Sequence, residues 1–162
     1  MINPVMKEKE QFSLMGISVR TSNANEMTEE AKIPGLWERY YGQEVFYKMP
    51  NLMYASATYG LYSDYVAGVN GEYTLTVGFE VNDYSELPKE FAVKTIPAAK
   101  YMVFTSEKGS ISEIVFKLWQ DIWRWFEQEG AERTYTGDFE VYDERCLDTK
   151  NAQVDIYIAI KA

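Results

Sequence analysis

The chain has 162 residues, 46% of them hydrophobic, which suits one folded domain with a sizeable core and excludes a disordered polypeptide. Its net charge of −9 disfavours binding to phosphate backbones and favours cationic ligands. The sequence has no histidine and a single cysteine, Cys146. Histidine-based catalytic triads and an internal disulfide are therefore excluded, and we expect neither a metal nor a cofactor.

The amino-terminal residues lack the apolar stretch of a signal peptide, and no apolar run is long enough to span a bilayer. We therefore expect a cytoplasmic protein without membrane partners. The sequence contains no glycine-rich phosphate loop of the Walker or dinucleotide type. No helix-turn-helix segment precedes the predicted elements, so direct contact with nucleic acid is not expected either.

The first half of the chain, residues 11–81, contains one helical pattern between strand patterns. Gly16 interrupts the first strand and predicts a β-bulge, while Pro34 and Gly35 indicate that the helix begins or restarts there. Asn70-Gly71 is a strong hairpin signal. The predicted elements are a strand over 11–21, a helix over 27–41, and strands over 52–61 and 73–81.

The second half, residues 91–161, repeats the same order. Pro97 breaks its first strand pattern, Ser110 with Glu113 matches a capping box, and Gly130 ends the helical stripe. The predicted elements are a broken strand over 91–105, a helix over 111–128, and strands over 138–142 and 154–160.

These patterns predict an α+β fold of two pseudo-symmetric strand-helix-strand-strand halves with antiparallel sheets. Each half lays one helix on a sheet face, and we expect the opposite faces to form a ligand cleft between the halves. The polar segment 82–90 is a short linker, so residues 1–162 are interpreted as a single domain.

Glu140 is the most informative candidate residue. Alternation over 138–142 places Phe139 and Val141 on one face, which we expect to pack under the second helix, and Glu140 on the other. A carboxylate among aromatic rings attracts a lipophilic cation by charge and by cation–π contact. The alternative is an ordinary solvated carboxylate on an exposed strand face.

The order and spacing of several short segments resemble GyrI-like small-molecule-binding domains, which also serve as effector-binding parts of multidrug-sensing and AraC-type transcription regulators. The resemblance extends from about Phe12 to Ile160. The segments that carry it are IPGLW at 33–37, IPAAKY at 96–101, LW at 118–119, FEVY at 139–142 and VDIYIAI at 154–160.

The resemblance implies roles for particular residues. Glu140 matches the glutamate that members hold in a central cleft for cationic ligands, and Trp37, Trp119 and Tyr142 match the aromatic lining. Tyr59 is added as a fifth ligand-binding residue. Tyr59 and Tyr62 cannot both face one cleft on a regular strand, because their spacing is odd. No catalytic residue is assigned.

The resulting hypothesis is a module that binds amphipathic cationic small molecules and sequesters or senses them, as a homodimer or with a separate regulatory partner. The alternative is a GyrI-like hydrolase of strained, cyclopropane-type electrophilic genotoxins that uses the same glutamate to activate water. A third interpretation is a regulator subunit or an interaction protein whose cleft is vestigial.

Overall fold

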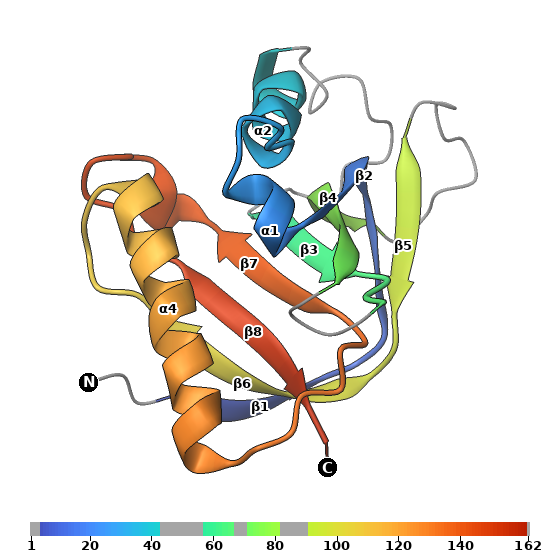
Figure 1. Ribbon diagram of the computed structural model, residues 1–162, viewed down its shortest axis with the longest axis vertical. Coiled ribbons are helices and arrows are strands. Elements are labelled where there is room, and N and C mark those ends of the chain that lie inside the picture. The colour runs from blue at the N-terminus through green and yellow to red at the C-terminus, as the bar shows by residue number, and fades with distance from the viewer. Residues whose placement is uncertain (1–3, 43–56, 67–70, 82–90, 162) are drawn as a thin grey trace.

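The computed structural model describes residues 4–42, 57–66, 71–81 and 91–161 and has the predicted α+β fold, with one eight-stranded antiparallel sheet (Figure 1). Its elements in chain order are β1 (Val5–Lys9), β2 (Phe12–Ser22), α1 (Asn23–Glu26), α2 (Ile33–Gly42), β3 (Thr58–Ser63), β4 (Glu72–Val81), β5 (Ala92–Ile96), β6 (Ala99–Thr105), α4 (Ile111–Glu129), β7 (Asp138–Tyr142), a 3₁₀ turn (Glu144–Cys146) and β8 (Asp155–Ile160).

The strand order reflects the repeat in the sequence. Across the sheet the strands run β1-β6-β8-β7-β3-β4-β2-β5. From the centre outward, the first half contributes β3, β4 and β2, which are its second, third and first strands. The second half contributes β7, β8 and β6 in the same way. Each half's preceding strand, β1 or β5, then pairs with the first strand of the other half. The sheet is therefore pseudo-symmetric about the seam between β3 and β7.

The sheet is strongly curled. Three strand spacings separate β2 from β7, which is about 14 Å in a flat sheet. Yet the rings of Phe12 on β2 and Phe139 on β7 have centroids only 5.3 Å apart. The curl encloses a core that also contains Leu14, Leu61, Ile96, Tyr101, Val103 and Ala159.

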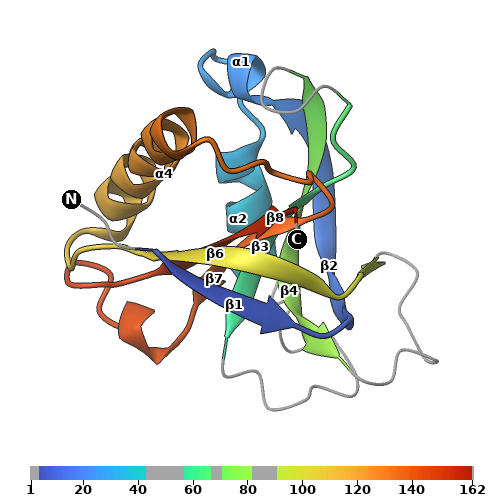
Figure 2. The ribbon, with the colours of Figure 1, turned by 90° about the horizontal axis from the view of Figure 1, so that it is seen from below.

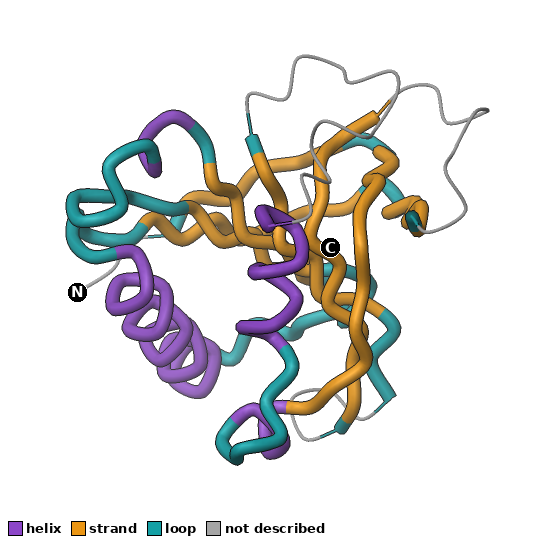
Figure 3. The backbone as a smooth tube through the Cα atoms, turned by 90° about the horizontal axis from the view of Figure 1, so that it is seen from above, coloured by secondary structure: helices purple, strands orange, loops and turns teal. Residues whose placement is uncertain are grey.

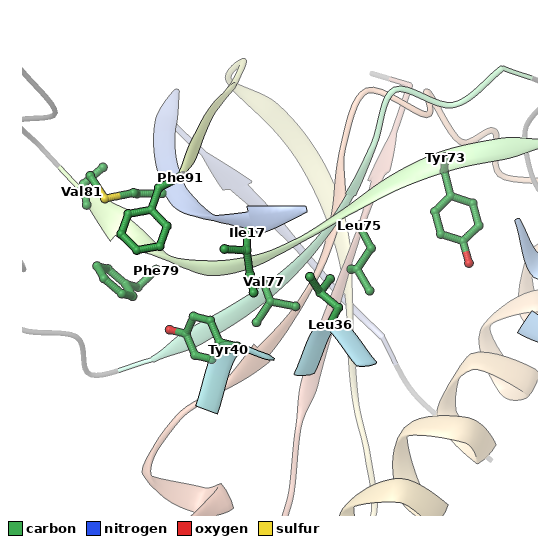
Figure 4. Packing of buried hydrophobic residues seen from close by; sticks show 10 residues of the cluster. Ile17, Leu36, Tyr40, Tyr73, Leu75, Val77, Phe79, Val81 and Phe91 are labelled. Atoms are coloured by element: carbon green, nitrogen blue, oxygen red, sulfur yellow. The ribbon is translucent and has the colours of Figure 1, made fainter. Parts of the chain in front are cut away.

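Both long helices lie together on the other face of the sheet (Figures 2 and 3). Leu36 and Tyr40 of α2 pack against residues of β2 and β4, including Ile17, Leu75 and Val77 (Figure 4). The buried residues of α4, Ile114, Leu118 and Ile122, pack against side chains of β6 and β8. The sheet is thus buried on both faces.

This arrangement corrects one expectation about β7. Phe139 and Val141 do not pack under the second helix, because they belong to the core inside the curl. Glu140 instead faces the helices. The alternation itself is as predicted, but the two sets of side chains lie on the opposite faces of the sheet from those expected. Both faces offer an apolar environment, one beneath the helices and one inside the curl, and the sequence pattern does not distinguish them.

Other local predictions have mixed outcomes. The strand at Gly16 has no bulge, because its register with β4 is continuous from Ser13 to Ser22. Ser110 occupies the N-cap of α4 but its side chain makes no capping hydrogen bond, whereas Gly130 ends that helix in the left-handed conformation as expected. The strand β1 was not predicted. The Asn70-Gly71 turn, the linker 82–90 and the start of the strand at 52–61 fall wholly or partly outside the described residues.

Gly16 and Gly78 face one another across β2 and β4 because the two backbones approach closely there. A Cβ on Gly16 would overlap the carbonyl group of Val77. We expect Gly16→Ala to lower the free energy of unfolding by at least about 3 kcal/mol, since backbone cannot move aside as a side chain can. Gly35→Ala is the control. Its Cβ meets nothing within 4 Å in α2, so it should raise stability by about 0.5–1 kcal/mol. Urea unfolding of both variants measures the difference, and equal effects would contradict the close approach.

Candidate functional site

The candidate site lies at the centre of the helix-covered face of the sheet. Strand pairing places one residue from each of six strands in a row across that face. The outer members lie in the cores beneath the two helices, and the middle pair, Glu140 and Gly60, lies between those cores. In sheet order the row is Phe104, Ile156, Glu140, Gly60, Val77 and Ile17.

Glu140 is 3% exposed and accepts hydrogen bonds from three different elements. Its Oε2 accepts from the Tyr62 hydroxyl of β3 at 2.9 Å and from the Trp119 indole N–H of α4 at 2.7 Å. Its Oε1 accepts from the Tyr142 hydroxyl at 2.6 Å. These contacts hold the carboxylate at the seam between the two halves.

All three donors are neutral, so the carboxylate charge has no counter-ion in the described part of the chain. Burial raises the pKa of Glu140, while the three hydrogen bonds oppose that change. Burial and the adjacent carboxylate also raise the pKa of Tyr62 far above its usual value. Tyr62 therefore remains a protonated donor wherever Glu140 is ionised.

Aromatic rings surround the carboxylate in edge-to-face pairs. The rings of Trp37 and Tyr142 have centroids 5.1 Å apart, and those of Tyr62 and Trp119 are 5.3 Å apart. The ring centroid of Trp123 lies 6.0 Å from that of Trp119. Trp123 is 38% exposed and extends this cluster along α4 towards the surface. The cluster combines π-faces, a buried negative charge and, in Trp123, a ring that reaches the surface.

Four of the five candidate residues meet here. Trp37, Trp119 and Tyr142 lie around Glu140, although Trp119 and Tyr142 contribute polar hydrogens as well as rings. Tyr59 does not: its ring stacks on Phe139 in the core on the other face of the sheet, so the structure does not bring it to Glu140. Because Tyr59 and Tyr62 are three residues apart on β3, their side chains lie on opposite faces of the sheet, and Tyr62 is the one on the face of Glu140.

Tyr62 and Gly60 are the residues that sequence reasoning missed. They share the face of Glu140 because Gly60 stands directly opposite it in the β3–β7 register. A strand pattern gives parity within one strand, but the choice between Tyr59 and Tyr62 requires the pairing with β7. That pairing joins positions about 80 residues apart in sequence.

A second buried carboxylate lies two residues away. Asp138 is 0% exposed and accepts a 2.6 Å hydrogen bond from Tyr65, but it also forms a 2.6 Å ion pair with Arg133, whose side chain is 6% exposed. Arg133 therefore compensates the Asp138 charge, whereas Glu140 has no cationic partner among the residues that the structure describes.

No cluster of three or more potential metal-ligating side chains occurs among the described residues. Within the same residues, none of the helices has the length and apolar character needed to cross a membrane.

Comparison with known proteins identifies the family. A model of Cass2, the integron-associated effector-binding protein, matches residues 6–160. The chain belongs to this effector-binding family. The resemblance to GyrI-like domains inferred from the short segments is thus confirmed, and small-molecule binding in a regulator-like domain is the activity that the family supports.

Three similar proteins extend this result. YobU of Bacillus subtilis (strain 168), which is described as a transcriptional regulator protein, is 43% identical to this chain over 90% of each of the two. The integron cassette protein VCH_CASS2 from the mobile metagenome of Vibrio cholerae has a TM-score of 0.78 at 30% identity, over 98% of this chain and 95% of that one. SAV2435, solved bound to tetraphenylphosphonium, has a TM-score of 0.82 at 19% identity, over 99% of this chain and 94% of that one.

The raised pKa of Glu140 predicts how stability depends on pH. The folded protein holds this proton more tightly than the unfolded chain, so the contribution is fully present below the ordinary pKa of 4.5 and is lost as the pH rises through the raised value. Glu140→Gln removes this loss. We expect the variant to be at least as stable as the wild type at neutral pH, with the difference shrinking below pH 4.5.

Urea unfolding at several pH values measures the effect, with Glu144→Gln at an exposed position as the control for charge removal. If Glu140→Gln were markedly less stable at neutral pH, the three hydrogen bonds to the ionised carboxylate would outweigh its desolvation.

Proposed function

We propose that this protein binds lipophilic cations against the aromatic cluster around Glu140. The observation that carries the proposal is a buried carboxylate whose hydrogen-bond donors, within the described part of the chain, are all neutral. Burying a charge without a counter-ion costs free energy, and a cation entering the site recovers part of that cost. A neutral or anionic ligand of the same size gains no such term.

The arrangement of donors bears on what such a ligand contacts. A carboxylate offers about four lone-pair positions, and Tyr62, Trp119 and Tyr142 use three of them. A cation near Glu140 therefore interacts mainly through charge and through ring faces, which suits bulky cations whose charge is screened by apolar groups. Burial of apolar ligand surface supplies the rest, at about 25 cal/mol per Å² before ordering costs.

The comparisons support this ligand class. The family is one of effector-binding proteins, and SAV2435, which shares the fold, is described with tetraphenylphosphonium, a bulky lipophilic cation. We infer that the bound cation acts here as an effector, which the protein sequesters or reports to a regulatory partner.

The test compares tetraphenylphosphonium with tetraphenylborate, which has nearly the same shape and the opposite charge. We expect tryptophan quenching and a micromolar Kd for the cation, about −8 kcal/mol, and much weaker binding of the anion. Cation binding should weaken as the pH falls through the raised pKa of Glu140, because the protonated carboxyl carries no charge.

Glu140→Gln keeps the shape and removes the charge, so cation affinity should fall by roughly 1–3 kcal/mol in calorimetric titration. Glu144→Gln changes the net charge equally at an exposed position and should bind like the wild type. Equal binding of cation and anion, or full affinity in the Glu140→Gln variant, would refute the electrostatic basis of the proposal.

A further inference from the structure

Gly60 occupies a special position beside the carboxylate. It stands opposite Glu140 in the β3–β7 register and is buried on the same face of the sheet. A Cβ at this position would lie 2.9 Å from Oε1 of Glu140 and 3.5 Å from Cζ2 of Trp37. The first separation is shorter than carbon and oxygen atoms tolerate without moving apart, and the second is ordinary contact.

The reason for glycine here differs from that at Gly16 and Gly78. At those positions a Cβ would overlap backbone of the neighbouring strand, so glycine is required for the sheet itself. At Gly60 the nearest atoms belong to side chains. Its backbone φ is also not in the left-handed range, so the chain conformation does not require glycine. What the missing side chain leaves free is the space of the Glu140 carboxylate.

The carboxylate has little freedom to yield. Its Oε2 is held by Tyr62 and Trp119, and its Oε1, the atom that faces Gly60, accepts the 2.6 Å hydrogen bond from Tyr142. Moving Oε1 away from an added methyl group stretches at least one of these three bonds. The geometry of the charge therefore depends on the residue at position 60.

We propose that Gly60 is a positioning residue for ligand binding: its lack of a side chain sets where the Glu140 carboxylate lies and thereby sets affinity for cations. The effect on cation affinity rests on the proposed function, whereas the effect of Gly60 on the position of the carboxylate does not. Gly60 itself makes no polar contact with the ligand. It acts through Glu140.

The experiment is a double-mutant cycle of Gly60→Ala and Glu140→Ala with tetraphenylphosphonium as the probe. In the wild-type background we expect Gly60→Ala to weaken cation binding about tenfold, which corresponds to about 1.4 kcal/mol, and to lower the Tm. In the Glu140→Ala background no carboxylate is displaced. The same change should then leave the residual affinity unaltered and should keep or raise the Tm, because alanine is less costly than glycine within a strand.

Equal losses of affinity in both backgrounds would overturn the proposal, since Gly60 would then act through Trp37 or through the strand alone. Gly35→Ala, the same substitution in open space on α2, controls for unspecific effects and should bind the cation like the wild type.

The thermal arm needs no ligand and separates this inference from the proposed function. If tetraphenylphosphonium fails to bind the wild type, the proposed function fails, while the opposite signs of the Tm changes still support the role of Gly60 in placing the carboxylate. If Gly60→Ala alone does not fold, recovery of folding in the double variant supports the proposal. Failure of the double variant, with Glu140→Ala folded, overturns it.

Discussion

The arrangement of the site depends on one buried charge, to which the described residues supply hydrogen bonds but no opposite charge. Three neutral donors from β3, β7 and α4 converge on the Glu140 carboxylate. Each contact ties a different part of the chain to the same two oxygen atoms. Because hydrogen bonds to a charged group are stronger than those between neutral groups, the charge helps to hold together the elements that enclose it. Its desolvation is at the same time a free-energy cost, which a bound cation reduces under the proposed function.

The internal repeat explains why the charge lies at the centre. The two halves meet along β3 and β7, and the row that crosses this seam has Gly60 on one side and Glu140 on the other. The seam is the part of this face that neither core cluster beneath α2 or α4 includes. The two positions that face each other across the seam hold one residue without a side chain and one with a long charged side chain. The first leaves space for the second.

Much of the fold follows from local patterns. Period-two alternation located β4, β7 and β8, and the apolar stripe with Gly130 located α4, because these elements bury one regular set of side chains. β1 escaped prediction since Val5 and Met6 are more than half exposed at the sheet edge, which leaves no buried set to produce a pattern. The prediction of a bulge at Gly16 was wrong because glycine in a strand is favoured both by a bulge and by a close approach of two backbones.

The site was only partly predictable. Residue type and resemblance selected Glu140, Trp37, Trp119 and Tyr142, which the structure brings together. The face on which they lie could not be derived from β7 alone, because the curled sheet buries Phe139 on one side and Glu140 on the other. Likewise, Tyr62 rather than Tyr59 faces the carboxylate because of a strand register that links distant parts of the chain. Local patterns give the spacing of side chains, whereas sheet curvature and register decide which of them meet.

Asp138 and Glu140 are two buried carboxylates of one strand that differ in the residues that contact them. Both are buried, both lie on β7 and both accept hydrogen bonds from tyrosines. Arg133 neutralises Asp138 within the fold. Removing either partner would leave an uncompensated buried charge, so this pair serves the stability of the folded protein. Among the described residues, those that contact the Glu140 carboxylate are neutral hydrogen-bond donors, which lower the free-energy cost of burying its charge without cancelling that charge. On the same strand, two residues apart, one carboxylate completes the structure and the other retains a negative potential that only a cation from outside the described residues can neutralise.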